Sequence, residues 1–408
     1  MKFIARQPIF TRKRRVYAYE LLFRSGIENF CEGVDLDRAS ASMFDTSFQM
    51  GLQKLTGGKR AFVNCPRDFL LQDYISLFPR DQVVVELLET IKPDEKVLEA
   101  CRQLKEKGYL LALDDFVDTP DWAPLVALAD IIKVDFRLTT REEQRALAVR
   151  YAGKRLRMLA EKVETPQEFS EAAEMGYSLF QGYFFCRPEI LRQRSIPASK
   201  LAYFELLQAT SAHDFNPKLL ASKIKHEASL TFKLLRYLNS AAFAFRAEIH
   251  SISQALNLLG EREVRKWIAV VFVGVMADGK PDEQMTVPVV RGRFCELLAS
   301  QIGMAGEASD LFLLGLLSII DAILDQPLEV ILKELSVRSE IKEALLGHSC
   351  PYRDILDMAI AFERADWEKI SALASKFRCK DENISALYVE AVEWATALRS
   401  GTRQLVTA

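Results

Sequence analysis

Polar side chains that could bind a metal ion follow a series of short apolar runs in the first half of the sequence. The stretch LALDDF, residues 111–116, ends an apolar run with Asp114 and Asp115. Other runs end in the same manner, and the polar residues at their ends are Glu20, Asn64, Glu86 with Glu89, Lys133 with Asp135, Glu161 with Glu164, and Gln181. Any one of them alone is more simply read as a solvated loop residue or a helix N-cap. Their agreement across seven runs predicts a shared site.

Oxygen ligands in this number are typical of hard cations such as Mg²⁺ or Mn²⁺. The adjacent Asp114 and Asp115 could bridge two such ions. A pair of ions activates a water molecule and neutralises a phosphoryl group. Lys133 would then offset the remaining negative charge or hold a water molecule. The pattern therefore favours metal-dependent chemistry on a phosphoryl group.

The apolar runs that must position these residues read as β-strands with helix-like stretches between them. The runs are YAYELLF, KRAFVNCP, QVVVELLE, YLLALDDF, ADIIKVDF, RLRMLAEKVE and YSLFQGYF. With the N-terminal KFIARQPI they make about eight strands in about 190 residues, the size of a TIM-like (β/α)8 barrel. In such a barrel the active site lies at the carboxyl ends of the strands. The polar residues above stand at those ends.

The second half of the chain reads as a separate, all-helical domain. Its apolar residues recur three or four positions apart, as in ISQALNLLGEREVRKWIAVVFVGVMA. Between the two halves, RPEILRQRSIPASK combines two prolines with basic residues and lacks apolar periodicity. We therefore expect a barrel over residues 1–190, a linker over 191–200 and a helical domain over 201–400.

The composition indicates a globular protein, because 49% of the 408 residues are hydrophobic and 27% are charged. A net charge of −2 gives no overall reason to expect binding to nucleic acid or to a membrane surface. The seven cysteines lie far apart without a CxxC pair, which favours reduced thiols. The N-terminal MKFIARQ lacks the apolar segment of a signal peptide, so a cytoplasmic location is expected.

The motifs of the first half resemble the EAL domain, a barrel family that hydrolyses cyclic di-GMP. The signature appears as YELLFR and is followed in order by FVNCP, ELLE, LDDF, KVD, AEKVE and FQGYFF. The resemblance implies metal ligands at Glu20, Asn64, Glu86, Asp114 and Asp115. It also implies that Lys133, Glu161 and Gln181 handle the attacking water, with Glu161 as general base, that Gln7, Arg24 and Gln181 contact the dinucleotide, and that Glu89 couples a loop to the site.

The surroundings of these residues depart from the family pattern. Active members follow the aspartate pair with a glycine-rich loop, DDFGTGYSS or close to it, whereas this chain reads DDFVDTPDWAP. Glycine reaches backbone conformations that other residues reach only at a cost. Leu21, Leu88 and Lys162 replace an alanine, a threonine and a glycine of the family pattern. We therefore expect weak or absent hydrolysis with binding of cyclic di-GMP, and the alternative is an active phosphodiesterase that forms the linear dinucleotide.

The second half resembles the HDOD domain, a helical relative of the HD metal phosphohydrolases, most clearly in LRYLNSAAF and SISQALNLLG. Where an HD enzyme carries GLLHDIG, this chain reads GLLSIID, so Ser318 and Ile319 stand at the positions of the metal ligands. The four histidines, His213, His226, His250 and His348, lack metal-ligand spacing. The resemblance implies a bacterial signalling protein in which this module binds a protein partner. The C-terminal ISALYVEAVEWATALRSG could form a homodimer or pack on its own domain.

Overall fold

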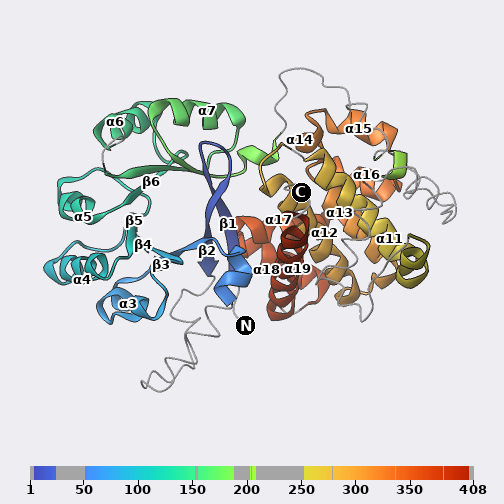
Figure 1. Ribbon diagram of the computed structural model, residues 1–408, viewed down its shortest axis with the longest axis horizontal. Coiled ribbons are helices and arrows are strands. Elements are labelled where there is room, and N and C mark those ends of the chain that lie inside the picture. The colour runs from blue at the N-terminus through green and yellow to red at the C-terminus, as the bar shows by residue number, and fades with distance from the viewer. Residues whose placement is uncertain are drawn as a thin grey trace. The chain divides into compact units, whose positions relative to one another are not determined.

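The computed structural model describes residues 4–23, 51–151, 155–187, 203, 205–207, 252–277, 279–335, 337–379 and 381–403 (Figure 1). The chain divides into two compact units, one formed by residues 1–187 with residues 363–365 and one formed by the remainder. The expected domain limits at residues 190 and 200 lie outside the described residues, as do LRYLNSAAF, Arg24, His213, His226 and His250.

The first unit is a closed barrel of eight strands that neighbour one another in chain order. The strands are β1 (Ile4–Thr11), β2 (Val16–Phe23), β3 (Arg60–Cys65), β4 (Val83–Leu87), β5 (Leu110–Leu113), β6 (Ile131–Asp135), β7 (Arg157–Glu161) and β8 (Leu179–Gln181). From β2 to β8 each strand is parallel to the next. The predicted barrel is confirmed.

The first strand breaks the parallel order. A tight turn at residues 12–15 joins β1 directly to β2, and β1 is antiparallel to both β2 and β8. Because of this reversal, the beginning of β1 lies at the end of the barrel where the other strands finish. Gln7 is consequently paired with Glu20, near the end of β2. The strand–helix alternation expected from the sequence begins only after this hairpin.

Short helices surround the strands (Figure 1). They are α3 (Arg67–Leu71), α4 (Glu95–Glu106), α5 (Ala123–Leu128), α6 (Arg141–Tyr151) and α7 (Pro166–Met175), with single 3₁₀ turns η1 (Tyr74–Leu77), η2 (Pro120–Trp122) and η3 (Phe184–Cys186). Three of these helices begin at residues that satisfy free backbone amides, and before α6 Thr140 Oγ1 accepts from Glu143 N. The Asp94 carboxylate accepts from Val97 N, and Thr165 and Glu168 form a reciprocal capping box.

An apolar layer fills the barrel interior. One side chain from each strand contributes, and the set is Ile9, Ala18, Phe62, Val84, Ala112, Ile131, Leu159 and Leu179, all fully buried. Burial of this layer drives the strands together. Polar side chains inside the barrel beyond this layer must therefore find their partners mainly in one another.

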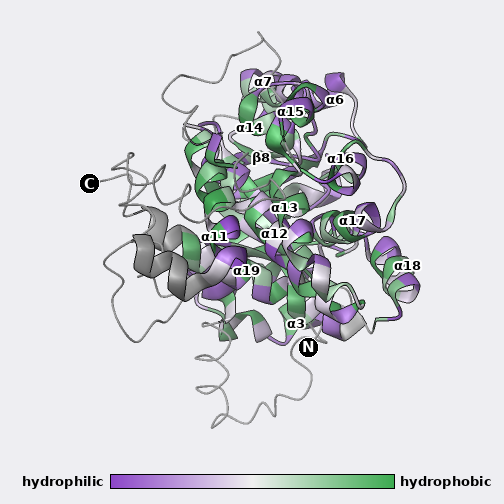
Figure 2. Ribbon diagram, turned by 90° about the vertical axis from the view of Figure 1, so that its right-hand side faces the viewer, coloured by the Kyte–Doolittle hydropathy of each residue, from purple (hydrophilic) through white to green (hydrophobic). Residues whose placement is uncertain are grey.

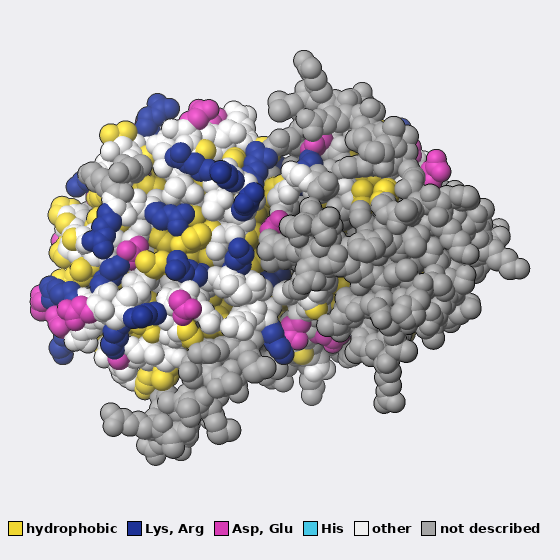
Figure 3. Space-filling model, in the orientation of Figure 1, with side chains coloured by type: hydrophobic (Ala, Val, Ile, Leu, Met, Phe, Trp, Pro, Cys, Tyr) yellow, Lys and Arg dark blue, Asp and Glu magenta, His cyan; other side chains and the backbone are white. Residues whose placement is uncertain are grey.

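Arginines near the amino ends of the strands are held by groups other than carboxylates. Arg12 Nε donates to Tyr177 O at 2.8 Å, and Arg60 Nε donates to Asp81 O at 3.1 Å. The Arg157 guanidinium lies 4.4 Å from the centre of the Tyr17 ring. Figure 3 shows many Lys and Arg side chains on the barrel face turned to the viewer.

The second unit, as far as it is described, is helical, as the sequence predicts (Figure 1). The helices are α11 (Ile252–Met276), α12 (Glu283–Gln301), η4 (Ala305–Glu307), α13 (Ala308–Leu317), α14 (Ile320–Leu324), α15 (Leu328–Glu334), α16 (Ser339–Leu345), α17 (Pro351–Arg364), α18 (Trp367–Phe377) and α19 (Asp381–Arg403). Along α17 and α18, each helix carries both hydrophilic and hydrophobic residues (Figure 2). This pattern is typical of helices with one buried face. No helix of the described residues is long and apolar enough to cross a membrane.

Two glycines allow α12 and α13 to pack backbone against backbone. A Cβ atom on Gly315 would lie 2.4 Å from the carbonyl carbon of Arg291, and one on Gly292 would lie 2.8 Å from Phe312 O. Both distances are too short for real contacts. Gly315 begins the GLLSIID segment, so this glycine is explained by packing alone.

Alanine in place of Gly315 is expected to lower the stability of the helical unit by about 1–3 kcal/mol, because the added methyl group forces two helices apart. Gly306 is the matched control, since a Cβ there meets no atom within 4 Å. Urea unfolding of both variants checks this. Equal midpoints for Gly315→Ala and Gly306→Ala would contradict the packing argument.

Candidate metal and catalytic site at the mouth of the barrel

Lys133 lies at the centre of the predicted site. Its Nζ atom is 2.7 Å from Glu86 Oε1, 2.7 Å from Asp114 Oδ1, 2.9 Å from Glu161 Oε1 and 3.3 Å from Glu20 Oε1. The contact with Glu86 is an ion pair without hydrogen-bond geometry, whereas Glu20 accepts a hydrogen bond. The lysine is 1% exposed. Five strands, β2, β4, β5, β6 and β7, thus direct one charged residue each to a single point.

Gln181 ties the antiparallel first strand into this cluster. Its Nε2 atom donates to Gln7 Oε1 at 2.8 Å and to Glu20 Oε2 at 2.6 Å. Gln7 and Glu20 are also paired in the register of β1 and β2. The structure therefore brings Gln7 and Gln181, two of the predicted dinucleotide contacts, to the same mouth as the acids.

Burial and crowding shift the pKa values of the cluster. Burial favours the neutral amine of Lys133, but the surrounding carboxylates outweigh it and raise the pKa of Lys133 well above its ordinary value. Burial, followed by the charge of Glu20, raises the pKa of Glu86 well above the ordinary range. Burial likewise raises the pKa of Glu161 to about 8, although Lys133 opposes the shift. One ammonium does not offset the burial and mutual repulsion of four carboxylates, so the pKa values of Glu86 and Glu161 stay raised.

The donor set fits hard divalent cations. Buried oxygens without a hydrogen-bond partner among the described residues include Asn64 Oδ1, Glu86 Oε2 and Gln181 Oε1. Each could coordinate a cation directly. Asp114, Asp115 and Glu161 each offer an oxygen, and these three oxygens lie within 4.8 Å of one another. All are hard oxygen ligands, which suit Mg²⁺ or Mn²⁺.

Charge supports the same fit. Glu20, Glu86, Asp114, Asp115 and Glu161 carry five negative charges when ionised, against one positive charge on Lys133. Two divalent cations would balance the difference. Burial and then the neighbouring Asp114 raise the pKa of Asp115, which is the expected effect of uncompensated negative charge.

Some predicted residues lie apart from the cluster. Glu89 is exposed in the turn after β4. Asp135 is buried, but its carboxylate accepts from the backbone amides of Arg137 and Leu138 and pairs with Lys162 Nζ. Asp135 therefore holds the turn after β6, and Lys162 pairs with an acid outside the proposed metal ligands.

The hollow above the cluster adds residues that the sequence did not single out. Besides the predicted side chains, Arg137 and Tyr183 line it. Each follows a strand end by two residues, after Asp135 and Gln181 respectively. That spacing could have marked them, because residues just beyond a barrel strand surround the active site.

Two site residues have unusual backbone conformations. Asp115 has φ of 40° and Lys162 has φ of 54°, in the left-handed region that favours glycine. This explains why the family pattern has glycine where this chain has Lys162. The lysine side chain is 57% exposed, so its pair with Asp135 is only partly shielded from solvent.

The segment after the aspartate pair is anchored to α6. Asp118 Oδ2 lies 2.7 Å from Arg150 Nη1, and Tyr151 donates its hydroxyl to Asp118 Oδ1 at 2.8 Å. Phe116 packs edge-on against both Tyr151 and Trp122. No residue between Phe116 and Trp122 has positive φ. The segment therefore takes a path that needs no glycine, different from the one expected of a glycine-rich loop.

In the helical unit, the position of the HD metal motif is filled by a serine that an arginine holds by a hydrogen bond. Ser318 Oγ donates to Gly315 O at 2.6 Å and accepts from Arg291 Nη1 at 3.0 Å. Ile319 is buried. Burial raises the pKa of Asp321, which favours its neutral form. His348 is exposed.

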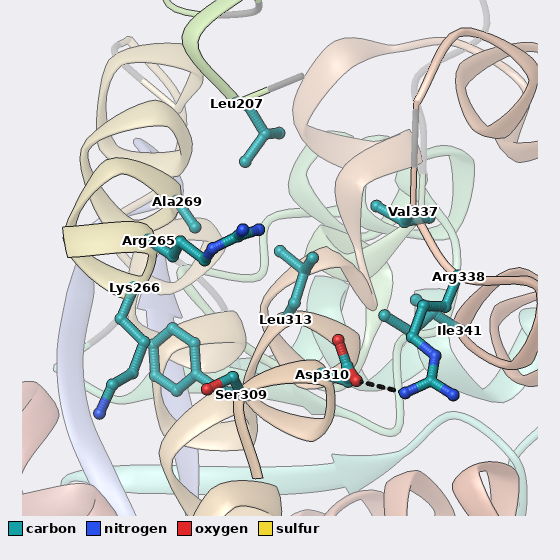
Figure 4. Close-up of a pocket in the computed structure, with 11 residues that line it drawn as sticks. Leu207, Arg265, Lys266, Ala269, Ser309, Asp310, Leu313, Val337, Arg338 and Ile341 are labelled. Carbon is teal, nitrogen blue, oxygen red and sulfur yellow. Dashed lines mark hydrogen bonds and ion pairs between the residues drawn. The ribbon is translucent and has the colours of Figure 1, made fainter. Parts of the chain in front are cut away.

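A second hollow lies among the helices. Arg265 and Ala269 of α11, Leu313 of α13 and Ile341 of α16 line it, and Asp310 pairs with Arg338 at 2.9 Å (Figure 4). Its volume is about 60 Å³. Small-molecule sites usually have about 300–1,000 Å³. The hollow is therefore too small for a nucleotide.

Comparisons with known proteins agree with the two-part reading. The EAL domain model matches residues 63–188, and the HDOD domain model matches residues 196–340. The uncharacterized protein YuxH of Bacillus subtilis is 37% identical over 96% of this chain and 97% of its own length. The cyclic di-GMP phosphodiesterase CdgJ of Vibrio cholerae is 33% identical over 96% of this chain and 92% of its own. The chain belongs to the family of EAL–HDOD proteins.

One solved structure completes the comparison. BlrP1 of Klebsiella pneumoniae, in a complex with calcium and cy-diGMP, is 25% identical with a TM-score of 0.36. The match covers 46% of this chain and 55% of that one.

Glycine at position 162 should stabilise the protein relative to methionine. Both substitutions remove the pair with Asp135, but only Lys162→Gly removes the left-handed strain, which costs about 1 kcal/mol. Chemical denaturation of the two variants measures the difference. A Lys162→Met variant as stable as Lys162→Gly would show that the backbone at this position is unstrained.

In the presence of a chelator that removes divalent cations, the free energy of unfolding of the protein should fall as pH rises. Glu161 has a pKa of about 8 in the folded protein against an ordinary value of 4.5, so the folded state binds more protons between these values. The stabilisation that Glu161 gives the folded protein is fully present below pH 4.5 and is lost as pH rises through about 8. Unfolding midpoints across this range should fall less steeply for Glu161→Gln than for wild type. An unchanged slope would contradict the assignment.

Proposed function

We propose that this protein is a cyclic di-GMP signalling protein whose barrel binds the dinucleotide with divalent cations and hydrolyses it slowly. The observation that carries the proposal is the convergence of acids from four strands on one mouth around Lys133, which a fifth strand supplies. The curated relative CdgJ, named a cyclic di-GMP phosphodiesterase, supports the choice of substrate.

In this proposal the donor atoms at the mouth have distinct roles. Glu20, Asn64, Glu86, Asp114 and Asp115 would hold Mg²⁺ or Mn²⁺. Those ions supply an activated water molecule and neutralise the phosphoryl group. Glu161 would take the proton from the water at its carboxylate, which lies at the same mouth as the proposed ligands Asp114 and Asp115. Gln7 and Gln181 orient the dinucleotide from β1 and β8.

Slow turnover follows from the surroundings of the donors. Lys133 engages four of the acids, and the segment after Asp115 is fixed to α6 through Asp118. A ligand displaced by about 1 Å can cost about a hundredfold in rate. An EAL enzyme with unimpaired turnover is the second candidate, and the name of CdgJ favours it.

The helical unit would act as the output of the signal. Ser318 and Ile319 occupy the positions of the metal ligands and Arg291 donates to Ser318, which leaves partner binding as the proposed role of this unit. We place the protein in the cytoplasm, where thiols such as Cys65 and Cys101 stay reduced.

Glu161→Gln should abolish turnover while leaving dinucleotide binding intact, because the amide cannot accept the proton. The assay mixes full-length protein, cyclic di-GMP and excess Mn²⁺ and follows bound nucleotide and linear product together. Glu106→Gln, an exposed change on α4, controls for the loss of one negative charge.

The outcomes separate the candidates. Product that forms slowly, disappears on chelation and depends on Glu161 supports the proposal. Rapid product formation favours the second candidate. Binding without product would make the barrel a receptor, and absence of both would refute a role for the dinucleotide.

A further inference from the structure

We propose that Lys133 is the internal counter-ion of this site and competes with divalent cations for the same carboxylates. The inference rests on the proposed function, since it concerns how the proposed metal site is loaded. It assigns Lys133 a role that precedes any chemistry. Lys133 preserves the arrangement of the acids when no divalent cation is bound. It also raises the concentration of divalent cation that is needed for binding.

The contacts of Lys133 support this role. Its ammonium lies within 2.7–3.3 Å of four carboxylates, and its side chain is 1% exposed. The nearby cation Lys162 is turned to Asp135 and is 57% exposed. Lys133 thus supplies the positive charge at the centre of the cluster, where four acids would otherwise repel one another across a water-poor interior.

A divalent cation bound to Glu86 and Asp114 would stand next to the ammonium, because Lys133 contacts an oxygen of each. Like charges at such a distance repel strongly where burial weakens solvent screening. Metal binding must therefore draw Lys133 away from these acids. The energy of that displacement reduces the apparent metal affinity.

Part of the donor set is left open by the lysine. Asn64 Oδ1 and Glu86 Oε2 are buried without hydrogen-bond partners among the described residues, and Asp115 is absent from the four carboxylates that contact Lys133. A first cation could engage these atoms before Lys133 moves. The donor atoms thus form two sets, one without contact to Lys133 and one whose carboxylate oxygens contact its ammonium.

The test measures Mn²⁺ binding to full-length protein by isothermal titration calorimetry, without nucleotide. Lys133→Met should bind Mn²⁺ at least about tenfold more tightly than wild type, because the competing charge is gone. Lys162→Met is the matched control, since it removes a positive charge from the same mouth but from outside the carboxylate cluster. We expect less than about threefold change for Lys162→Met.

Every outcome bears on the inference. Unchanged or weaker Mn²⁺ binding by Lys133→Met would overturn the inference, and so would an equal gain in affinity for Lys162→Met. In either case, Mn²⁺ binding by the wild-type protein would leave the proposed function standing. If neither wild type nor Lys133→Met binds Mn²⁺, both proposals fail. If Lys133→Met and Lys133→Gln are unfolded in chelator, recovery of the fold on adding Mn²⁺ supports the inference, and failure to recover overturns it.

Discussion

The ammonium of Lys133, held by four carboxylates inside the barrel, is the interaction on which the site depends. Glu86 is fully buried, and a buried charge without a partner would destabilise the fold. The apolar layer beneath provides no polar alternative. The acids and the lysine are therefore stable only together, and this mutual dependence keeps side chains from separate strands in one place.

Strand polarity makes this convergence possible. Parallel strands present their carboxyl ends at one mouth, so Glu86 and Asp114 meet although 28 positions separate them in the sequence. The antiparallel β1 adds Gln7 from its beginning instead of its end. A barrel with this one reversal thus surrounds the acids on all sides, with amides from β1 and β8 completing the ring.

The apolar runs and their polar ends predicted the barrel and the grouping of the acids, because both follow from local sequence pattern. The reversal of β1 and the central position of Lys133 were not predictable in the same way, since they depend on how strands far apart in sequence meet. Lys162 illustrates a middle case. The sequence shows that Lys162 replaces a glycine of the family pattern. Only the folded structure shows that Asp135 is the acid with which Lys162 pairs. A polar residue close to a strand end does not always join the cluster, since Glu89 lies in an exposed turn after β4.

The central claim is that these carboxylates form a cation site shared by Lys133 and divalent metal. Anomalous X-ray diffraction from crystals of the protein grown with Mn²⁺ tests it most directly. The account predicts Mn²⁺ bound by Glu86 and Asp114, with Lys133 Nζ withdrawn from both carboxylates. Mn²⁺ bound elsewhere, or bound at these acids with Lys133 still in contact with all four carboxylates, would contradict it.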